Sequence, residues 1–275
     1  MSSTRMRHGR LGPIGVLVLA IGVLWVLIPL AYLLSMAFMT RTEVISGSYL
    51  PATLQWENWQ AVVEAGIPRT IGNSLLVAVG ATLITLVLAT PAAWAIARHG
   101  AGGKALSAVI LAPWLLPPIV AVVPIFVLLR VAGLNNTLLG ITLVYSLVNV
   151  PVAVWLLEGF VRRLPGEIEE AGTVDGAGDL GLLLRIVVPL IAPGIVAVGI
   201  IITVLSYNEY LLASFILLQP EVHTLPVAIS LFQGDRFAHL GRIAAASVAG
   251  VLPVYAVAVL FQRWLVSGLT SGGVK

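Results

Sequence analysis

The sequence predicts an all-α integral membrane protein with six transmembrane helices. Of its 275 residues, 59% are hydrophobic and only 10% are charged, and the mean hydropathy is +1.04. Soluble domains carry roughly a quarter charged residues, so this much apolar surface needs lipid around it. Long stretches without acidic or basic side chains recur along the chain, which indicates repeated membrane crossings.

Each predicted span is at least about 20 mostly apolar residues long, enough to cross roughly 30 Å of hydrocarbon. Five stretches contain no Asp, Glu, Lys or Arg: 11–39, 71–97, 105–129, 131–157 and 243–262. A sixth stretch, 186–218, is interrupted only by Glu209. The first stretch is longer than the apolar part of a signal peptide, which favours an uncleaved span. No internal repeat or low-complexity linker divides the spans, so residues 1–275 are predicted to form a single transmembrane domain.

The basic residues predict the orientation of these spans. Six spans place both termini on one side of the membrane. Basic side chains gather on that side, before the first span, in 98–104, in 162–185 and after the last span. The external segments hold fewer of them, spread over longer loops. The positive-inside rule therefore places both termini in the cytoplasm, and the segments 41–69 and 219–242 outside.

Several kinds of chemistry are missing from the sequence. The chain contains no cysteine, which excludes disulfides and thiolate metal sites. The segment 100–104 lacks the glycine spacing of a phosphate-binding loop and is followed by Ala105 rather than Ser or Thr. The four histidines are not spaced as metal ligands. We therefore expect no catalytic residues, no metal site and no cofactor on this chain, and a membrane-embedded enzyme is the weaker hypothesis.

The loop 162–189, between the fourth and fifth spans, is too long and too patterned for a plain connector. Pro165 can open a short helix whose first turns are acidic, where the positive helix end favours acids. Asp175 and Gly176 supply a turn, and a second short helix leads to Arg185 and the next span. An acidic helical hairpin suits a groove on a cytoplasmic partner. The alternative is a solvated loop whose charges merely keep it out of lipid.

The same loop resembles the coupling motif of ATP-binding-cassette (ABC) importer permeases. In that family Glu-Ala-Ala is followed by three residues and Gly, and then by a hydrophobic residue and Leu-Pro near the next span. The matching residues here are Glu170, Ala171, Gly172, Gly176, Ile186, Val188 and Pro189. Two positions depart from the pattern, since Gly172 stands where Ala is usual and Val188 where Leu is usual. Gly172 softens a helix by up to about 1 kcal/mol.

The resemblance implies that this loop contacts an ATP-binding subunit. The implied contact residues are Glu170, Glu169, Ala171, Asp175, Gly176 and Pro189. Adjacent residues on a helix point about 100° apart, so only one of the two glutamates can point into a groove. The motif register selects Glu170. We therefore expect Glu170→Ala to uncouple the complex and Glu169→Ala to cost less.

The C-terminal stretch 262–275 is similar to the end of the maltose-type inner-membrane permease, the second of the two permeases in carbohydrate importers. In that family the end of the chain forms a tail that reaches between the two ATP-binding subunits, and the matching tail here is 266–275. The implied tail contacts are Gly268, Gly272, Gly273 and Lys275. The resemblance implies the type I ABC importer permease fold and a location in the bacterial plasma membrane, with a sugar or sugar-like solute as cargo.

The implied partners are a second homologous permease, two copies of an ATP-binding subunit that hold ATP and Mg, and an external solute-binding protein. No nucleic-acid partner is expected. Two alternatives stay open: a permease of the same superfamily for another solute, such as glycerol phosphate, a polyamine or a metal, and a standalone secondary transporter.

The sixth apolar stretch contains candidates for a translocation path. If helical throughout, its 33 residues would reach about 50 Å, so the helix either projects from the membrane or breaks near Asn208. A carboxylate is costly beside lipid, so Glu209 should face a cavity, a cation or the outer surface. The resembling family often has aromatic-Asn-acid at this place. The path candidates are Tyr207, Asn208, Glu209, Asn73 and Asn149, and helix packing or interface anchoring is the alternative role for each.

Overall fold

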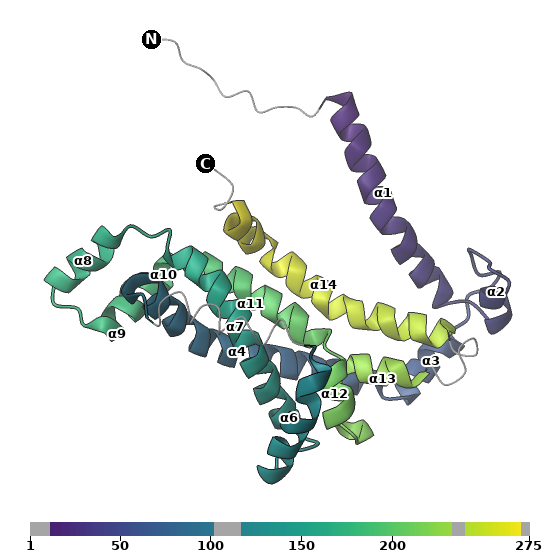
Figure 1. Cartoon of the computed structure of the whole chain (residues 1–275). Helices are drawn as coiled ribbons and strands as arrows, with labels where there is room; N and C mark the ends of the chain where they lie inside the picture. Colours follow the sequence, from purple (N-terminus) through teal and green to yellow (C-terminus); the bar gives the residue numbers. More distant parts are fainter. Residues whose placement is uncertain (1–11, 102–116, 233–239, 271–275) are drawn as a thin grey trace. The chain divides into compact units, whose positions relative to one another are not determined.

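The computed structural model describes residues 12–101, 117–232 and 240–270 (Figure 1). Within these ranges the chain is helical and contains no β-strand, so the predicted all-α class is confirmed. The elements are α1 (Pro13–Met36), α2 (Arg41–Ile45), α3 (Glu57–Glu64), α4 (Ile67–His99), α6 (Ile119–Val131), α7 (Leu138–Val161), α8 (Gly166–Val174), α9 (Asp179–Leu182), the π-helical turn η1 (Leu183–Val187), α10 (Val188–Leu190), α11 (Ala192–Tyr207), α12 (Leu211–Ile216), the 3-10 turn η2 (Pro220–Val222), α13 (Leu225–Leu231) and α14 (Leu240–Thr270).

Four of these helices are long and apolar enough to cross a membrane: α1, α4, α7 and the part of α14 at Leu240–Val257. A fifth span results if Asp179–Leu190 and Ala192–Tyr207, which meet at a 78° bend, cross together. α6 is apolar but shorter, and much of the predicted span 105–129 lies outside the described residues. The described helices therefore account for four or five of the six predicted spans.

The sixth apolar stretch is broken. α11 ends at Tyr207, Asn208 closes it as the C-cap, and α12 begins at Leu211. Of the two possibilities predicted for this stretch, a projecting helix and a break near Asn208, the structure has the break.

The described chain forms two compact units. The first contains α1, α2, α3 and the beginning of α14, up to Ala249, and the second contains α4 to α13 and the rest of α14. The single domain over residues 1–275 stays a prediction.

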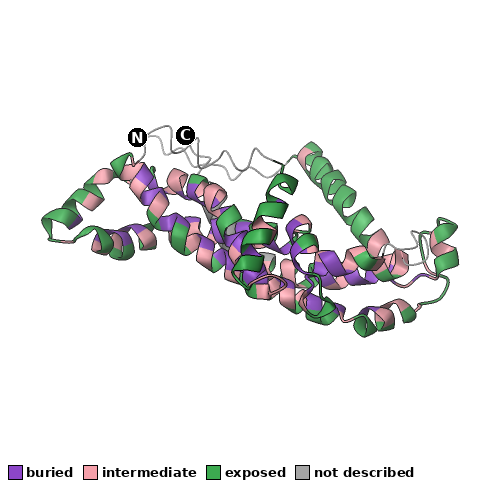
Figure 2. Cartoon of the chain, turned by 60° about the horizontal axis from the view of Figure 1, so that its bottom comes forward, coloured by how far each residue is buried: buried purple, intermediate pink, exposed green. Residues whose placement is uncertain are grey.

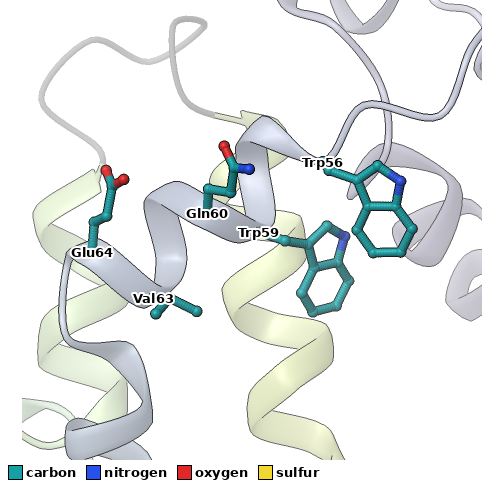
Figure 3. Close-up of a pocket in the computed structure, with 5 residues that line it drawn as sticks. All are labelled: Trp56, Trp59, Gln60, Val63 and Glu64. Atoms are coloured by element: carbon teal, nitrogen blue, oxygen red, sulfur yellow. The ribbon is translucent and has the colours of Figure 1, made fainter.

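In the first unit, α1 exposes apolar side chains on all sides and none of its residues is buried (Figure 2). The segment after it is held by aromatic contacts, because the ring of Phe38 lies 5.2 Å from that of Trp56 and 5.5 Å from that of Trp59. The two indole rings lie next to each other at one end of α3, and Glu64 lies at the other end (Figure 3). This arrangement agrees with an aromatic anchor at a membrane interface.

The core of the second unit lies where α4, α7 and α11 pack together. Small side chains let the helices approach closely, for example Ala89, Ala93 and Ala153, each fully buried. At one end this core continues into a cluster of Trp94, Val161, Leu182, Leu183, Val187 and Ile191. That cluster joins the ends of α4 and α7 to the segment that follows α8, and so supports the predicted coupling loop.

Candidate functional site

The predicted coupling motif forms helix α8, which has an exposed face and a buried face. Glu170, Ala171 and Asp175 are exposed, and Val174 at its end is 88% exposed. The predicted turn is present, because Gly176 has a φ of +84° and its N–H donates to the carbonyl of Thr173 at 3.0 Å. Glycine adopts this left-handed conformation without strain. Pro189 is also exposed, in α10.

Gly172 lies on the buried face of α8. A Cβ atom at this position would lie 2.6 Å from Cδ1 of Ile186 and 2.7 Å from Cδ2 of Leu182. The departure from alanine in the motif therefore lets α8 pack closely on the segment that leads to the next span.

Glu169 also points inward, and each of its carboxylate oxygens has a partner on α4. The indole Nε1 of Trp94 donates to Oε2 at 2.8 Å. Nε of Arg98 donates to Oε1 at 2.6 Å, and the two groups form an ion pair whose side chains are 19% and 12% exposed. A partly buried ion pair with this geometry is stronger than an exposed one.

Arg98 makes two further bonds. Its Nη2 donates to the carbonyl of Val161 at 3.1 Å and to that of Leu164 at 2.7 Å. Val161 is the last residue of α7, and Leu164 lies in the connection to α8. One side chain therefore joins the ends of α4 and α7 to the coupling helix.

The sequence analysis did not predict Trp94 or Arg98 as site residues. Their spacing indicates a shared face, because residues four apart lie on the same side of a helix, and both stand at the end of a predicted span. The partner of that face, however, is set by tertiary packing. The expectation that Glu169→Ala costs less than Glu170→Ala was made without these bonds, and with them we expect a larger cost at Glu169.

A second candidate site surrounds Glu209. Its carboxylate caps α12, accepting the N–H of Leu212 at 2.9 Å and that of Ala213 at 3.3 Å. The hydroxyl of Tyr145 on α7 donates to the same carboxylate at 2.5 Å. Among the described residues no cation pairs with Glu209.

Glu209 lines a partly open hollow of about 440 Å³. Its other polar lining groups are Tyr145, Asn149 and Ser206, and its walls are otherwise apolar, with residues such as Ala121, Ile125 and Leu212. Asn149 donates to the carbonyl of Tyr145 at 2.9 Å and to Oγ of Ser206 at 3.2 Å. The structure thus brings Glu209 and Asn149 together, and adds Tyr145 and Ser206, which the sequence analysis did not single out.

The other three path candidates do not line this hollow. Asn73 donates to the carbonyls of Glu221 at 3.1 Å and His223 at 2.9 Å, and so holds a loop on α4. The buried Tyr207 donates to the carbonyl of Gly250 at 2.9 Å and ties α11 to α14. Asn208 is exposed and donates to the carbonyl of Val204 at 2.8 Å, within its own helix end.

The predicted C-terminal tail is only partly described. Gly268 belongs to α14, which extends to Thr270, whereas Gly272, Gly273 and Lys275 lie outside the described residues. In the part of the chain that the structure describes, no group of three or more His, Asp or Glu side chains could hold a metal ion.

Apolar spans with a short acidic helix in the connection between two of them are the arrangement that the resemblance to a membrane-spanning transporter subunit implies. Residues 86–271 match the family described as binding-protein-dependent transport system inner membrane component, and the chain belongs to this family. It is therefore a transport permease of the ABC importer kind. A standalone secondary transporter does not agree with that membership.

Two relatives and one solved structure extend the comparison. The chain is 32% identical to the trehalose transport system permease protein SugB of Mycobacterium tuberculosis, over 91% of this chain and 93% of the relative. It is 32% identical to the diacetylchitobiose uptake system permease protein DasC of Streptomyces coelicolor, over 98% and 99%. The fold matches a chain in the crystal structure of a bacterial ABC transporter involved in the import of the acidic polysaccharide alginate, with a TM-score of 0.76 and 20% identity, over 91% of this chain and 94% of that chain.

Proposed function

We propose that this chain forms half of the translocation path of an ATP-driven importer that carries a sugar or sugar-like solute into the cytoplasm. The observation that carries the proposal is the full-length similarity to two permeases named for disaccharide uptake, those for trehalose and diacetylchitobiose. A second, homologous permease forms the other half. Two copies of a separate subunit bind ATP and Mg and hydrolyse the ATP, and an external solute-binding protein delivers the cargo.

The exposed side of the α8 to η1 segment supports docking of an ATP-binding subunit. The exposed carboxylates of Glu170 and Asp175 are accompanied by Val174, 88% exposed, and Leu180, 69% exposed. Apolar side chains exposed beside charged ones suit a protein interface, which combines an apolar core with a polar rim. In this proposal Glu170 contacts a basic group in the groove of the ATP-binding subunit.

The hollow beside Glu209 supports a role in passage of the cargo. A sugar presents hydroxyl groups that both donate and accept hydrogen bonds, between patches of apolar C–H surface. Glu209 and Tyr145 offer an acceptor and a hydroxyl, and apolar walls surround them. A few polar groups among apolar walls are the usual composition of a small-molecule site.

The orientation belongs to the same proposal. The distribution of basic residues supports a cytoplasmic location for both termini and for the loop 162–189. The chain has no cysteine, so a single Asp175→Cys variant gives an unambiguous label site. A membrane-impermeant thiol reagent should label it in opened cells and leave it unlabelled in intact cells. Labelling in intact cells would reverse the orientation.

Cargo is tested with the complex of both permeases and the ATP-binding subunits, reconstituted in liposomes with the binding protein. When a panel of disaccharides is tested, we expect at least one of them to stimulate ATP hydrolysis and to be taken up. Glycerol phosphate, a polyamine and a divalent metal ion are the matched non-sugar candidates. Stimulation by one of these, with no response to any sugar, would show that the cargo is not a sugar and that the chain is a permease of the same family for another solute.

A further inference from the structure

The Glu169 contacts support an inference about how force passes through this chain, and it rests on the proposed coupling function. We propose that Arg98 and Trp94 are positioning residues that fix the coupling helix α8 to α4, so that the two helices move as one body when ATP is hydrolysed. Both residues lie on α4 and neither belongs to the coupling motif.

The contact between Glu169 and α4 uses both oxygens of the carboxylate. Each oxygen of Glu169 accepts a hydrogen bond from a different side chain of α4, at 2.6 Å and 2.8 Å. Trp94 is only 7% exposed and its ring meets that of His99 edge to face at 5.2 Å, so the indole has little freedom to turn away. A carboxylate held by two buried or partly buried donors on one helix is fixed in direction as well as in distance.

Two different parts of the chain lie on either side of the contact. α8 carries the surface that the proposed function assigns to the ATP-binding subunit. α4 packs along α7 and α11, whose residues Tyr145, Asn149 and Ser206 line the hollow beside Glu209. Arg98 also binds the carbonyls at the end of α7. A displacement of α8 is therefore transmitted to α4, and through the packing of α4 to α7 and α11, which line the hollow.

The other ion pair of the described residues provides a comparison. Arg162 and Glu158 are four residues apart on one helix turn, and the Arg162 side chain is 57% exposed. That pair joins no second element, and its arginine is largely exposed, although Glu158 is only 15% exposed. It provides a matched control in which an arginine is lost close to the same loop without loss of a link between helices.

The consequence is a separation of two activities. Without the Arg98 contact, α8 still presents Glu170 to the ATP-binding subunit, and the complex still assembles and hydrolyses ATP. The movement of α8 no longer displaces α4 fully, so hydrolysis occurs without a matching uptake of solute. A residue that only stabilised the fold would lower the amount of complex and leave the uptake per ATP of the surviving complex unchanged.

The first test uses the reconstituted complex and measures uptake per ATP hydrolysed. Arg98→Ala and Glu169→Gln should each lower this ratio by about tenfold, the factor that about 1.4 kcal/mol of lost coupling produces. Arg162→Ala should leave it unchanged. Arg98→Lys, which keeps a cationic donor beside Glu169, should keep part of the ratio that Arg98→Ala loses. A normal ratio in Arg98→Ala, or a loss only in the amount of complex, would overturn the proposal.

The second test needs no identified sugar, so it separates this inference from the proposed cargo. Spin labels are attached to cysteines at the exposed Glu167 of α8 and at the exposed Val87 of α4, in the assembled complex. The distance between them should be the same and narrow in the nucleotide-free and ATP-bound states. In Arg98→Ala the ATP-bound distribution should shift or broaden. A distance that already changes between the two states in the wild-type complex would show that α8 and α4 do not move together.

Discussion

Glu169 and Glu209 are both half-buried carboxylates of the second unit, and the groups that satisfy them differ. Glu169 faces a guanidinium and an indole, both side chains of one long helix. Glu209 faces two backbone amides of the short helix α12 and the hydroxyl of Tyr145. A carboxylate paired with a cation is fixed in place, whereas one held by neutral donors can exchange a partner for a solute hydroxyl. The difference suits the first for transmitting force and the second for contact with cargo.

The largest expected effect separates Glu169 from its neighbour. Glu169→Ala leaves the guanidinium of Arg98 without its carboxylate, and breaking such a pair in a partly buried site costs up to several kcal/mol. We expect α8 to loosen in this variant, measured as faster proteolysis or hydrogen exchange over 166–176 in the purified chain.

Glu170→Ala is the matched control, because Glu170 is exposed and makes no contact with α4 that would hold α8. It should leave exchange over 166–176 unchanged and lower the retention of the ATP-binding subunit and the uptake. Wild-type uptake with all subunits retained in Glu170→Ala would remove the coupling role assigned to that residue. Equal exchange rates in the two variants would remove the distinction between the two glutamates.

The next effect concerns the hollow. Tyr145→Phe removes the hydroxyl bound to Glu209 and keeps the ring that packs in the core. Hydrogen bonds to charged groups are worth about 1.5–3 kcal/mol, so a roughly tenfold or larger loss of uptake is expected at limiting solute, with subunit retention intact. The Tyr207→Phe variant is the control, because its hydroxyl binds the carbonyl of Gly250 outside the hollow. If Tyr207→Phe lowered uptake as much as Tyr145→Phe, the hollow would not be the site of contact.

A smaller effect is expected from the C-terminal tail, a second proposed contact with the ATP-binding subunits. Deletion of 268–275 leaves the residues of the second unit's core in place, so membrane insertion should be normal. Uptake or its regulation should fall by a few-fold, an amount typical of losing an interface rim rather than its centre. If uptake and ATP hydrolysis equalled those of the full chain, the tail would have no role in coupling, and α8 would be the remaining proposed contact.

The sequence predicted local features better than contacts between distant elements. The all-α class, the break after Tyr207 and the turn at Gly176 follow from hydropathy, helix length and glycine conformation, which are local properties. The link from Glu169 to Arg98 joins residues 71 positions apart and depends on how two helices pack. The same holds for Gly172, because the space that only a glycine fits at this position is set by Ile186 and Leu182, which follow α8 in the chain.

The smallest effect is expected at a third carboxylate, Glu43, which lies outside the spans and, among the described residues, pairs with no cation. It completes a capping box with Thr40 and accepts the N–H of Ala52 at 2.8 Å. These hydrogen bonds, first that from Ala52 and then those from Thr40, lower the pKa of Glu43 below its ordinary value of 4.5. A lowered pKa means that the folded segment favours the ionised form.

The stabilisation by Glu43 is therefore complete above about pH 4.5 and is lost as the pH falls through the lower pKa of the folded state. The backbone amide of Ala52 should exchange slowly at neutral pH. After correction for intrinsic rates, its protection should fall as the pH drops from 4.5 through the lower pKa of the folded state. Glu43→Gln should show the weaker protection at every pH, because a neutral amide gains nothing from ionisation. The exposed Glu57 is the control, and Glu57→Gln should keep the wild-type pH dependence. A pH dependence that persists in Glu43→Gln would assign it to another group. Glu43 would then not stabilise its own loop through its charge, unlike Glu169 and Glu209, which connect different helices.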